Sequence, residues 1–312
     1  MKAGIVLPHV GASGGIRRLR RIAAGLAQRG YQVSTVTLGE ATARARHWSE
    51  IPAICRSLDC LICPGDLPLW QLAPLIPDSC SLHTFHLHLG MHDWRAEEGN
   101  IRSPRIRKAT SARWIQERIR RMGADCAWFG IAPFDEEVHF EPADRLLRIG
   151  TLAHACYGWK NTRAVFDALP EIERRCPGVE LWVYGQTSMP TPGRFFLNPD
   201  NRCRRRIYGH CRVWVVPSIS EGIGMCGLEA MLCRTPVVSA DNRGIREYAD
   251  ENTCLLFPPS AHQEMVRHVV SLLRDWELGA RMAERAFDRV SRLNFEDCLD
   301  RIESILRDTE AV

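Results

Sequence analysis

The sequence predicts an α/β protein with two doubly wound domains, and three observations support this fold class. Short apolar, β-branched runs alternate with amphipathic helical runs along the chain, as in successive parallel βαβ units. The length of 312 residues fits two domains of ordinary size. Hydrophobic residues make up 45% of the chain, which is typical of a globular protein with a core.

Four short apolar runs give the strands expected in the first domain, residues 1–144. They are residues 2–7, 32–38, 60–64 and 81–85. A helix is expected over 16–29, because apolar residues recur there at helical spacing. The arginines of this helix are expected on its remaining faces; they are Arg17, Arg18, Arg20 and Arg21. Residues 114–122 predict a second, strongly basic helix.

The second domain is expected over residues 145–290, after an acidic, turn-like linker at 134–142. Its predicted strands are 147–152, 180–184, 213–217, 236–239 and 254–257. Residues 187–201 are rich in Pro and Gly and predict an irregular loop. Helical periodicity continues from 261 to 308, and the last segment, 291–312, is expected to pack back on the first domain.

Two glutamates, Glu221 and Glu229, mark the candidate site. They follow the apolar run 211–216, which is a predicted buried parallel strand. Three glycines lie between the two glutamates and make the turn there flexible: Gly222, Gly224 and Gly227. With a helix expected from residue 228, Glu221 lies on the loop and Glu229 in the first helical turn. Open α/β sheets bind ligands at this end of their strands. Amides at a helix start suit phosphate and carboxylates suit hydroxyl groups, so the pattern favours a nucleotide sugar.

This segment resembles the E-x7-E signature of the retaining glycosyltransferases of the GT-B fold (glycosyl transferases group 1, family 4). Three further segments match the same family in order: residues 4–15, 149–160 and 241–247. The resemblance implies two Rossmann-like domains facing across a cleft, with the acceptor on the first and the nucleotide sugar on the second. Thr151 stands where the family usually has an arginine, which removes one expected phosphate contact.

The resemblance also implies roles for particular residues. Lys160 would neutralise charge growing on the departing diphosphate, Glu221 would contact the transferred sugar, and His83, with His86 in reserve, would be the strand-end histidine that touches the donor sugar. Glu229 would bind the nucleotide ribose. The remaining donor-binding positions are Gly224, Met225, Cys226, Gly227, Gly14 and Gly15. The arginines of 202–206 are expected to be mostly solvated.

Metal and cofactor sites are not predicted. The histidines at 83, 86, 88 and 92 match no common zinc spacing, and the sequence contains no D-x-D. Transfer is therefore expected to be metal-independent, with a nucleoside-diphosphate sugar of UDP or GDP type as donor substrate. The 13 cysteines are expected to be buried and reduced, including Cys60 and Cys63, which lie within one predicted strand.

The acceptor stays open at this stage. Residues 102–121 hold eight basic residues and one acidic residue, net +7, which suits an anionic membrane lipid or a hydroxymethylated base in DNA. Since no apolar run reaches the roughly 20 residues of a membrane span and the amino terminus lacks a secretory pattern, the protein is expected to be cytoplasmic or peripheral at the inner membrane face. The alternatives are a catalytically silent sugar- or nucleic-acid-binding relative and a nucleotide-sugar epimerase.

Overall fold

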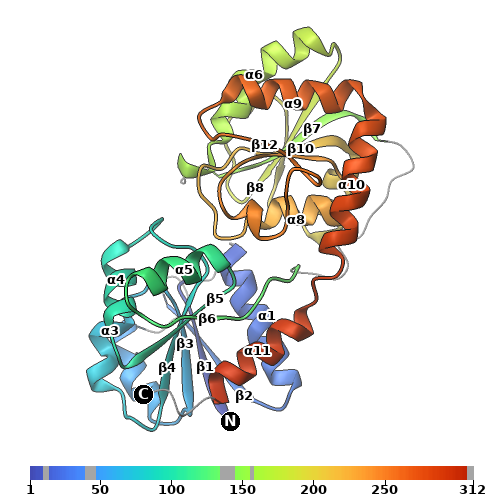
Figure 1. The fold of residues 1–312 in the computed structure, drawn as a ribbon. Helices are drawn as coiled ribbons and strands as arrows, with labels where there is room; N and C mark the ends of the chain where they lie inside the picture. The colour runs from blue at the N-terminus through green and yellow to red at the C-terminus, as the bar shows by residue number, and fades with distance from the viewer. Residues whose placement is uncertain (10–13, 39–46, 134–144, 155–157, 308–312) are drawn as a thin grey trace. The chain divides into compact units, whose positions relative to one another are not determined.

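The computed structural model describes residues 1–9, 14–38, 47–133, 145–154 and 158–307. It divides into two compact units, Met1–Phe134 with Asn294–Val312 and Asp135–Leu293. Each unit holds one six-stranded parallel sheet with helices packed on it, which confirms the predicted α/β class (Figure 1). The sequence placed the boundaries at 144 and 290 instead. The acidic segment expected as a linker, 134–142, lies outside the described residues.

The first unit has strand order β2-β1-β3-β4-β5-β6. Its strands are β1 (Lys2–Leu7), β2 (Gln32–Thr37), β3 (Cys60–Pro64), β4 (Ser81–His86), β5 (Ile106–Thr110) and β6 (Ala127–Trp128). Its α-helices are α1 (Gly14–Gln28), α2 (Ile51–Cys55), α3 (Leu69–Leu72), α4 (Trp94–Arg102), α5 (Arg113–Arg121) and α11 (Phe295–Arg307). The central strands are buried along almost their whole length. Burial on both faces explains the apolar sequences of β1 and β3, whereas β4 also buries two histidines and a threonine.

The last helix, α11, packs against α1 in the first unit. A side chain at Gly25 would place its Cβ 2.5 Å from Leu299 Cδ1, so the glycine lets the two helices approach closely. At the end of α1, Arg29 pairs with Glu296, Asp300 and Glu303 of α11. The helix α11 thus belongs to the unit formed by residues 1–134.

Arg18 corrects the expectation that all the arginines of α1 lie on exposed faces. Only 4% of its surface is exposed, and its guanidinium donates to the carbonyl oxygens of Ala132 at 2.9 Å and Gly130 at 3.0 Å. Because guanidinium carries five donors in a fixed plane, one side chain satisfies two backbone carbonyls of a buried segment. Arg18 therefore has a structural role.

The second unit has strand order β12-β11-β10-β7-β8-β9. Its strands are β7 (Leu146–Ala153), β8 (Glu180–Gly185), β9 (Arg194–Leu197), β10 (Cys211–Val216), β11 (Val237–Ala240) and β12 (Leu255–Phe257). Its α-helices are α6 (Thr162–Arg175), α7 (Asn201–His210), α8 (Met225–Leu232), α9 (His262–Arg274) and α10 (Trp276–Val290). The edge strand β9 lies in the segment 187–201, so the prediction of an irregular loop was wrong for Arg194–Leu197 and is confirmed for 187–193 and 198–200.

Strand order in the second unit reverses between β7 and β10, which makes this pair the topological switch point where such sheets bind ligands. Two residues of β7, Gly150 and Thr151, allow this strand to pack closely against β10. Gly150 packs against the ring of the buried Trp214. A Cβ at position 150 would come 2.3 Å from Trp214 Cε3, so only glycine fits here. Thr151, in place of the family's arginine, is fully buried and donates to the carbonyl oxygen of Val215 at 2.9 Å.

Candidate functional site

Lys160 and Glu221 form an ion pair at this switch point. Lys160 ends a short 3₁₀ helix, Gly158–Lys160, that follows β7, and Glu221 lies on the loop that follows β10. Lys160 Nζ is 2.6 Å from Glu221 Oε1, and the two side chains are 18% and 9% exposed. The structure therefore brings together two residues that the sequence predicted as catalytic, although they are far apart along the chain.

Backbone hydrogen bonds join the loop after β10 to the loop after β7. The amide of Ile219 donates to the carbonyl oxygen of Trp159 at 2.7 Å. Asn161 adopts a left-handed conformation, with φ of 51°, and its side-chain amide donates to the carbonyl oxygen of Pro217 at 3.3 Å. The positions of Lys160 and Glu221 are thus fixed by their backbones as well as by their own ion pair.

A second loop, after β11, also holds the loop that carries Glu221 in place. Asn242 Nδ2 donates to the carbonyl oxygen of Ser218 at 3.0 Å, while its Oδ1 accepts from the amide of Ile245 at 3.0 Å. Gly244 passes so close to Glu221 that a Cβ would come 2.8 Å from the Glu221 Cβ. Glycine is required here because the two backbones approach closely.

The helix α8 begins at Met225, three residues earlier than expected, because Gly224 ends the preceding turn with φ of 79°. The Tyr248 hydroxyl donates to the Gly224 carbonyl oxygen at 2.7 Å, and a Cβ at Gly227 would come 2.6 Å from that hydroxyl. Gly224 thus precedes α8, and Met225, Cys226 and Gly227 form its first turn, with the Gly227 amide donating to the Gly224 carbonyl oxygen at 3.0 Å. The helix dipole and the amides at a helix start favour an anion.

Glu229 lies in the second turn of α8, not in the first as expected, and only 2% of it is exposed. Its Oε2 accepts from the Tyr208 hydroxyl at 2.7 Å, and its Oε1 is 3.4 Å from Arg204 Nη1. The Tyr208 hydroxyl is also 2.6 Å from that of Tyr184. Burial, together with the Glu229 carboxylate, raises the pKa of Tyr184 and Tyr208 well above the usual range. In this structure the Glu229 carboxylate belongs to a buried charged network.

Sequence reasoning missed Arg204 and Tyr208. Arg204 belongs to the arginines of 202–206, which were expected to be mostly solvated, and Tyr208 follows them. Both lie on α7, and Arg204 is 7% exposed. One signal could have found them: Arg204, Ile207 and Tyr208 recur at positions i, i+3 and i+4, the spacing of a buried helix face. The neighbouring Arg202 and Arg206 are exposed, as expected.

His83 lies inside β4 and not at its end, so its expected position was wrong; the strand ends at His86. Both imidazoles are fully buried. His83 Nε2 is 3.0 Å from Ser81 Oγ, and His86 Nε2 is 3.1 Å from Thr84 Oγ1. Burial lowers the pKa of each imidazole to about 3, with nearby Arg107 adding to the effect at His83. The contact of either ring with a donor sugar stays a prediction.

The buried His83 predicts a loss of stability in acid. In the folded chain its pKa is about 3, below the 6.5 of a free imidazole, so only the unfolded chain takes up a proton between these values. Stability is therefore complete above pH 6.5 and falls as the pH decreases, by about 2 kcal/mol at pH 5. Thermal unfolding of the His83→Gln variant should depend less on pH than that of wild type. Identical slopes in the two proteins, with exposed His262→Gln as control, would rule out His83 as a source of acid sensitivity.

Of the two glycines at the start of α1, Gly15 shows no steric requirement. Gly14 is exposed, and a Cβ on Gly15 would lie 3.6 Å from Leu87 Cδ1, an ordinary contact. Tight helix packing therefore does not explain glycine at position 15. The donor-binding role expected for both stays a prediction.

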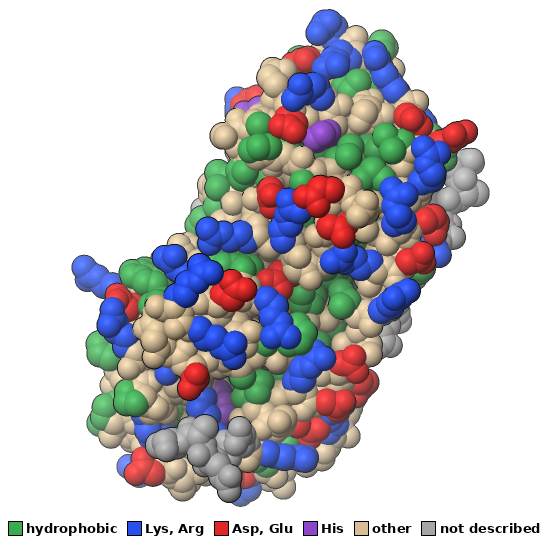
Figure 2. Space-filling model, in the orientation of Figure 1, with side chains coloured by type: hydrophobic (Ala, Val, Ile, Leu, Met, Phe, Trp, Pro, Cys, Tyr) green, Lys and Arg blue, Asp and Glu red, His purple; other side chains and the backbone are tan. Residues whose placement is uncertain are grey.

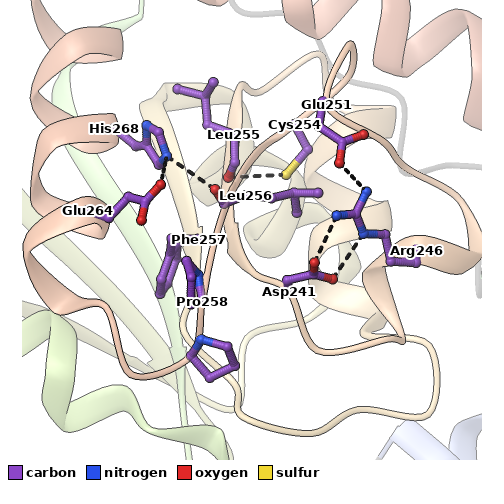
Figure 3. Close-up of a pocket in the computed structure, with 11 residues that line it drawn as sticks. Asp241, Arg246, Glu251, Cys254, Leu255, Leu256, Phe257, Pro258, Glu264 and His268 are labelled. Carbon is purple, nitrogen blue, oxygen red and sulfur yellow. Dashed lines mark hydrogen bonds and ion pairs between the residues drawn. The ribbon is translucent and has the colours of Figure 1, made fainter.

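A pocket of about 490 Å³ lies elsewhere in the second unit, beside β12 and α9 (Figure 3). Arg246 bridges Asp241 and Glu251 on one side of it, and His268 faces Glu264 on the other. Its charged groups thus pair with one another. None of the residues predicted for donor binding is among those that line it.

Part of the chain matches known glycosyltransferases in sequence. Residues 143–275 match the family described as Glycosyl transferases group 1. Alpha-D-kanosaminyltransferase of Streptomyces kanamyceticus is 40% identical over 73 residues, which cover 23% of this chain and 19% of that protein. D-inositol 3-phosphate glycosyltransferase of Mycobacteroides abscessus is 30% identical over 126 residues, which cover 34% of this chain and 28% of that protein. The matches thus span less than a third of each relative's length.

Solved structures match over nearly the whole chain. Sucrose-phosphate synthase from Thermosynechococcus elongatus has a TM-score of 0.78 at 15% identity, covering 98% of both chains. WaaG, a glycosyltransferase involved in lipopolysaccharide biosynthesis, has a TM-score of 0.77 at 13% identity, covering 99% of this chain and 100% of WaaG. Anabaena HepE in complex with UDP-glucose has a TM-score of 0.73 at 16% identity, covering 98% of this chain and 99% of HepE.

These likenesses establish the fold as GT-B, with two Rossmann-like α/β units. Together with the match of residues 143–275 to Glycosyl transferases group 1, they confirm the resemblance to the GT-B glycosyltransferases that the sequence predicted. Assignment to family 4, retention at the anomeric carbon and the type of donor stay predictions.

Proposed function

We propose that this protein transfers a sugar from a nucleoside-diphosphate sugar to an acceptor hydroxyl, with retention at the anomeric carbon and without a catalytic metal. The observation that carries the proposal is the Lys160–Glu221 pair at the switch point, close in sequence to the start of α8. A cation and a helix N-terminus in one unit suit the two negatively charged phosphates of a donor. HepE was solved with UDP-glucose, which favours a donor of the UDP type.

In this proposal Lys160 acts mainly on the leaving group. Negative charge grows on the diphosphate as its bond to the sugar breaks, and an ammonium group there stabilises the transition state more than the bound substrate. Glu221 holds Lys160 in place before the donor binds, because its Oε1 accepts from Nζ at 2.6 Å. The amides of Met225 and Cys226 at the start of α8 would take the remaining phosphate charge.

A donor screen tests the proposal directly. Purified protein is incubated with UDP- and GDP-linked sugars, and free nucleotide, altered sugar and nucleotide affinity are measured in the same samples. Transfer or slow hydrolysis should release UDP or GDP in the presence of EDTA. Nucleotide binding without release would favour the silent binding relative, and a changed sugar still linked to nucleotide would favour the epimerase. Absence of binding to every donor would contradict all three.

The acceptor proposed here is anionic and binds the basic surface of α5. Arg118, Arg120 and Arg121 are exposed. Arg113 is exposed too, but its guanidinium carbon stacks 3.6 Å from the centroid of the Trp128 ring, and Arg105 pairs with Asp78. Figure 2 shows Lys and Arg side chains over this part of the first unit, interspersed with hydrophobic and acidic ones. Arg118, Arg120 and Arg121 are thus exposed charges of the last turn of α5 that a ligand can reach, and Arg121 also pairs with Glu117 of the same helix at 3.4 Å.

Charge reversal at Arg118, Arg120 and Arg121 is expected to abolish binding to a polyanion. Wild-type association with anionic vesicles or duplex DNA should fall steeply as salt rises, since each phosphate contact displaces counterions. Vesicle sedimentation and DNA mobility shift identify which of the two binds. The matched control reverses Arg174, Arg267 and Arg281, three exposed arginines of the second unit. Equal loss in both triple variants, or weak salt-insensitive binding by wild type, would argue for a neutral acceptor.

A further inference from the structure

Three metal-ligand side chains converge in the first unit at the carboxyl ends of two neighbouring strands. Asp66 follows β3, and His88 and His92 follow β4. One ligand atom from each of the three lies within 4.8 Å of the others. The sequence did not predict this group, because the spacing of the two histidines matches no common zinc arrangement and the third residue comes from another strand.

The distances within this group suit ligands of one cation better than direct hydrogen bonds. His88 Nε2 is 3.9 Å from Asp66 Oδ2, beyond hydrogen-bonding range. Two ligands that each lie roughly 2.0–2.1 Å from a tetrahedral Zn²⁺ are about 3.4 Å apart, so small side-chain rotations would bring the pair into place. The rings of His88 and His92 meet edge to face, with centroids 4.3 Å apart.

An independent observation comes from Glu97 of α4, which has no exposed surface. Its Oε2 accepts from the amide of Gly90 at 2.6 Å, while its Oε1 has no hydrogen-bond partner in the part of the chain that is described. That oxygen lies 3.7 Å from His88 Nδ1, on the opposite side of the ring from Asp66. A buried carboxylate without a full set of partners is costly, so its position beside His88 calls for a function.

We propose that Asp66, His88 and His92 bind one divalent transition-metal ion of the Zn²⁺ type, and that Glu97 orients His88. Metal-binding histidines commonly donate their second ring N–H to a carboxylate, which fixes the ring and strengthens its bond to the metal. Three protein ligands leave a fourth position of the tetrahedron for water or another oxygen ligand. The proposal uses neither Lys160, nor Glu221, nor the start of α8, and it does not depend on the proposed transfer.

Metal affinity of the full-length protein tests the proposal. After treatment with EDTA and dialysis, the protein competes for Zn²⁺ with a chromophoric chelator, and we expect one tight site per chain. His92→Ala and Asp66→Asn should each weaken binding more than about 100-fold, and Glu97→Gln by roughly 10- to 100-fold, the range for residues that orient a ligand. His262→Ala, a change at an exposed histidine of the second unit, is the matched control.

Two results would overturn the site. One is wild-type affinity in the His92→Ala variant; the other is a Co²⁺ spectrum with a thiolate charge-transfer band, which would place the metal on cysteines. Full affinity in Glu97→Gln would remove Glu97 from the proposal. Circular dichroism checks that each variant is folded. Nucleotide binding should be the same with and without Zn²⁺, so failure of this site and failure of the donor site give different results.

Discussion

Replacement of Lys160 by alanine is expected to lower turnover by roughly two to three orders of magnitude at saturating donor, the scale of losing one group that stabilises a developing negative charge. The affinity for the donor should fall much less, since the charge on the diphosphate grows only as the bond breaks. Lys160 is suited to this role because it is largely buried and because Glu221, 2.6 Å away, fixes its ammonium group. Initial rates with the donor identified in the screen provide the measurement.

Two further variants make the Lys160 result specific. Arg163→Ala removes an exposed cation, close in sequence, that pairs with Asp167 of its own helix among the residues that the structure describes, and it should leave turnover unchanged. Glu221→Gln keeps an oxygen that can accept from Lys160 but removes the charge, so its loss should be smaller than that of Lys160→Ala if Glu221 only positions the lysine. Similar turnover in Lys160→Ala and wild type would exclude Lys160 from the chemistry.

Much of the candidate site could be predicted because it depends on local sequence. The apolar run before Glu221 and the glycines after it specify a buried strand, a turn and a helix start. The resemblance placed both Lys160 and Glu221 at the donor but did not predict their ion pair, since the pair results from the β7–β10 neighbourhood and not from a pattern in either segment. Strand β9 escaped prediction because an edge strand lacks a strong apolar alternation; its residues are half-buried or exposed.

The residue types alone could not predict that Arg204 joins the buried charged network around Glu229. A run of arginines is usually solvated, and the sequence treated 202–206 in that way. The structure buries Arg204 because α7 turns that position towards Glu229. Likewise, Asp66 and His88 meet because β3 and β4 are neighbours, and a ligand pair formed across strands leaves no spacing signature.

Replacement of Glu229 by alanine is expected to destabilise the second unit by about 3–5 kcal/mol, because it leaves Arg204 buried without its carboxylate. Arg204 and Glu229 side chains are only 8% and 3% exposed, so water cannot replace the lost partner. Glu229→Gln should cost less, since its oxygen can still accept from the Tyr208 hydroxyl. Native-state hydrogen exchange of the β10 amides measures the free energy of unfolding of this unit.

The double variant Glu229→Ala with Arg204→Met tests the cause. If the buried charge of Arg204 is responsible, removing it should recover much of the stability lost in Glu229→Ala. A loss equal to the sum of the two single losses would show that the pair is not coupled.

Glu229→Gln also separates the structural role of Glu229 from its predicted contact with ribose. If Glu229 contacts the ribose, Glu229→Gln should weaken the free energy of nucleotide binding by about 1.5–3 kcal/mol, the contribution of a hydrogen bond to a charged group. The free energy of unfolding should change little. Lowered stability with unchanged nucleotide affinity would assign Glu229 to the framework that holds α7 against α8, and would leave donor recognition to Lys160, Glu221 and the start of α8.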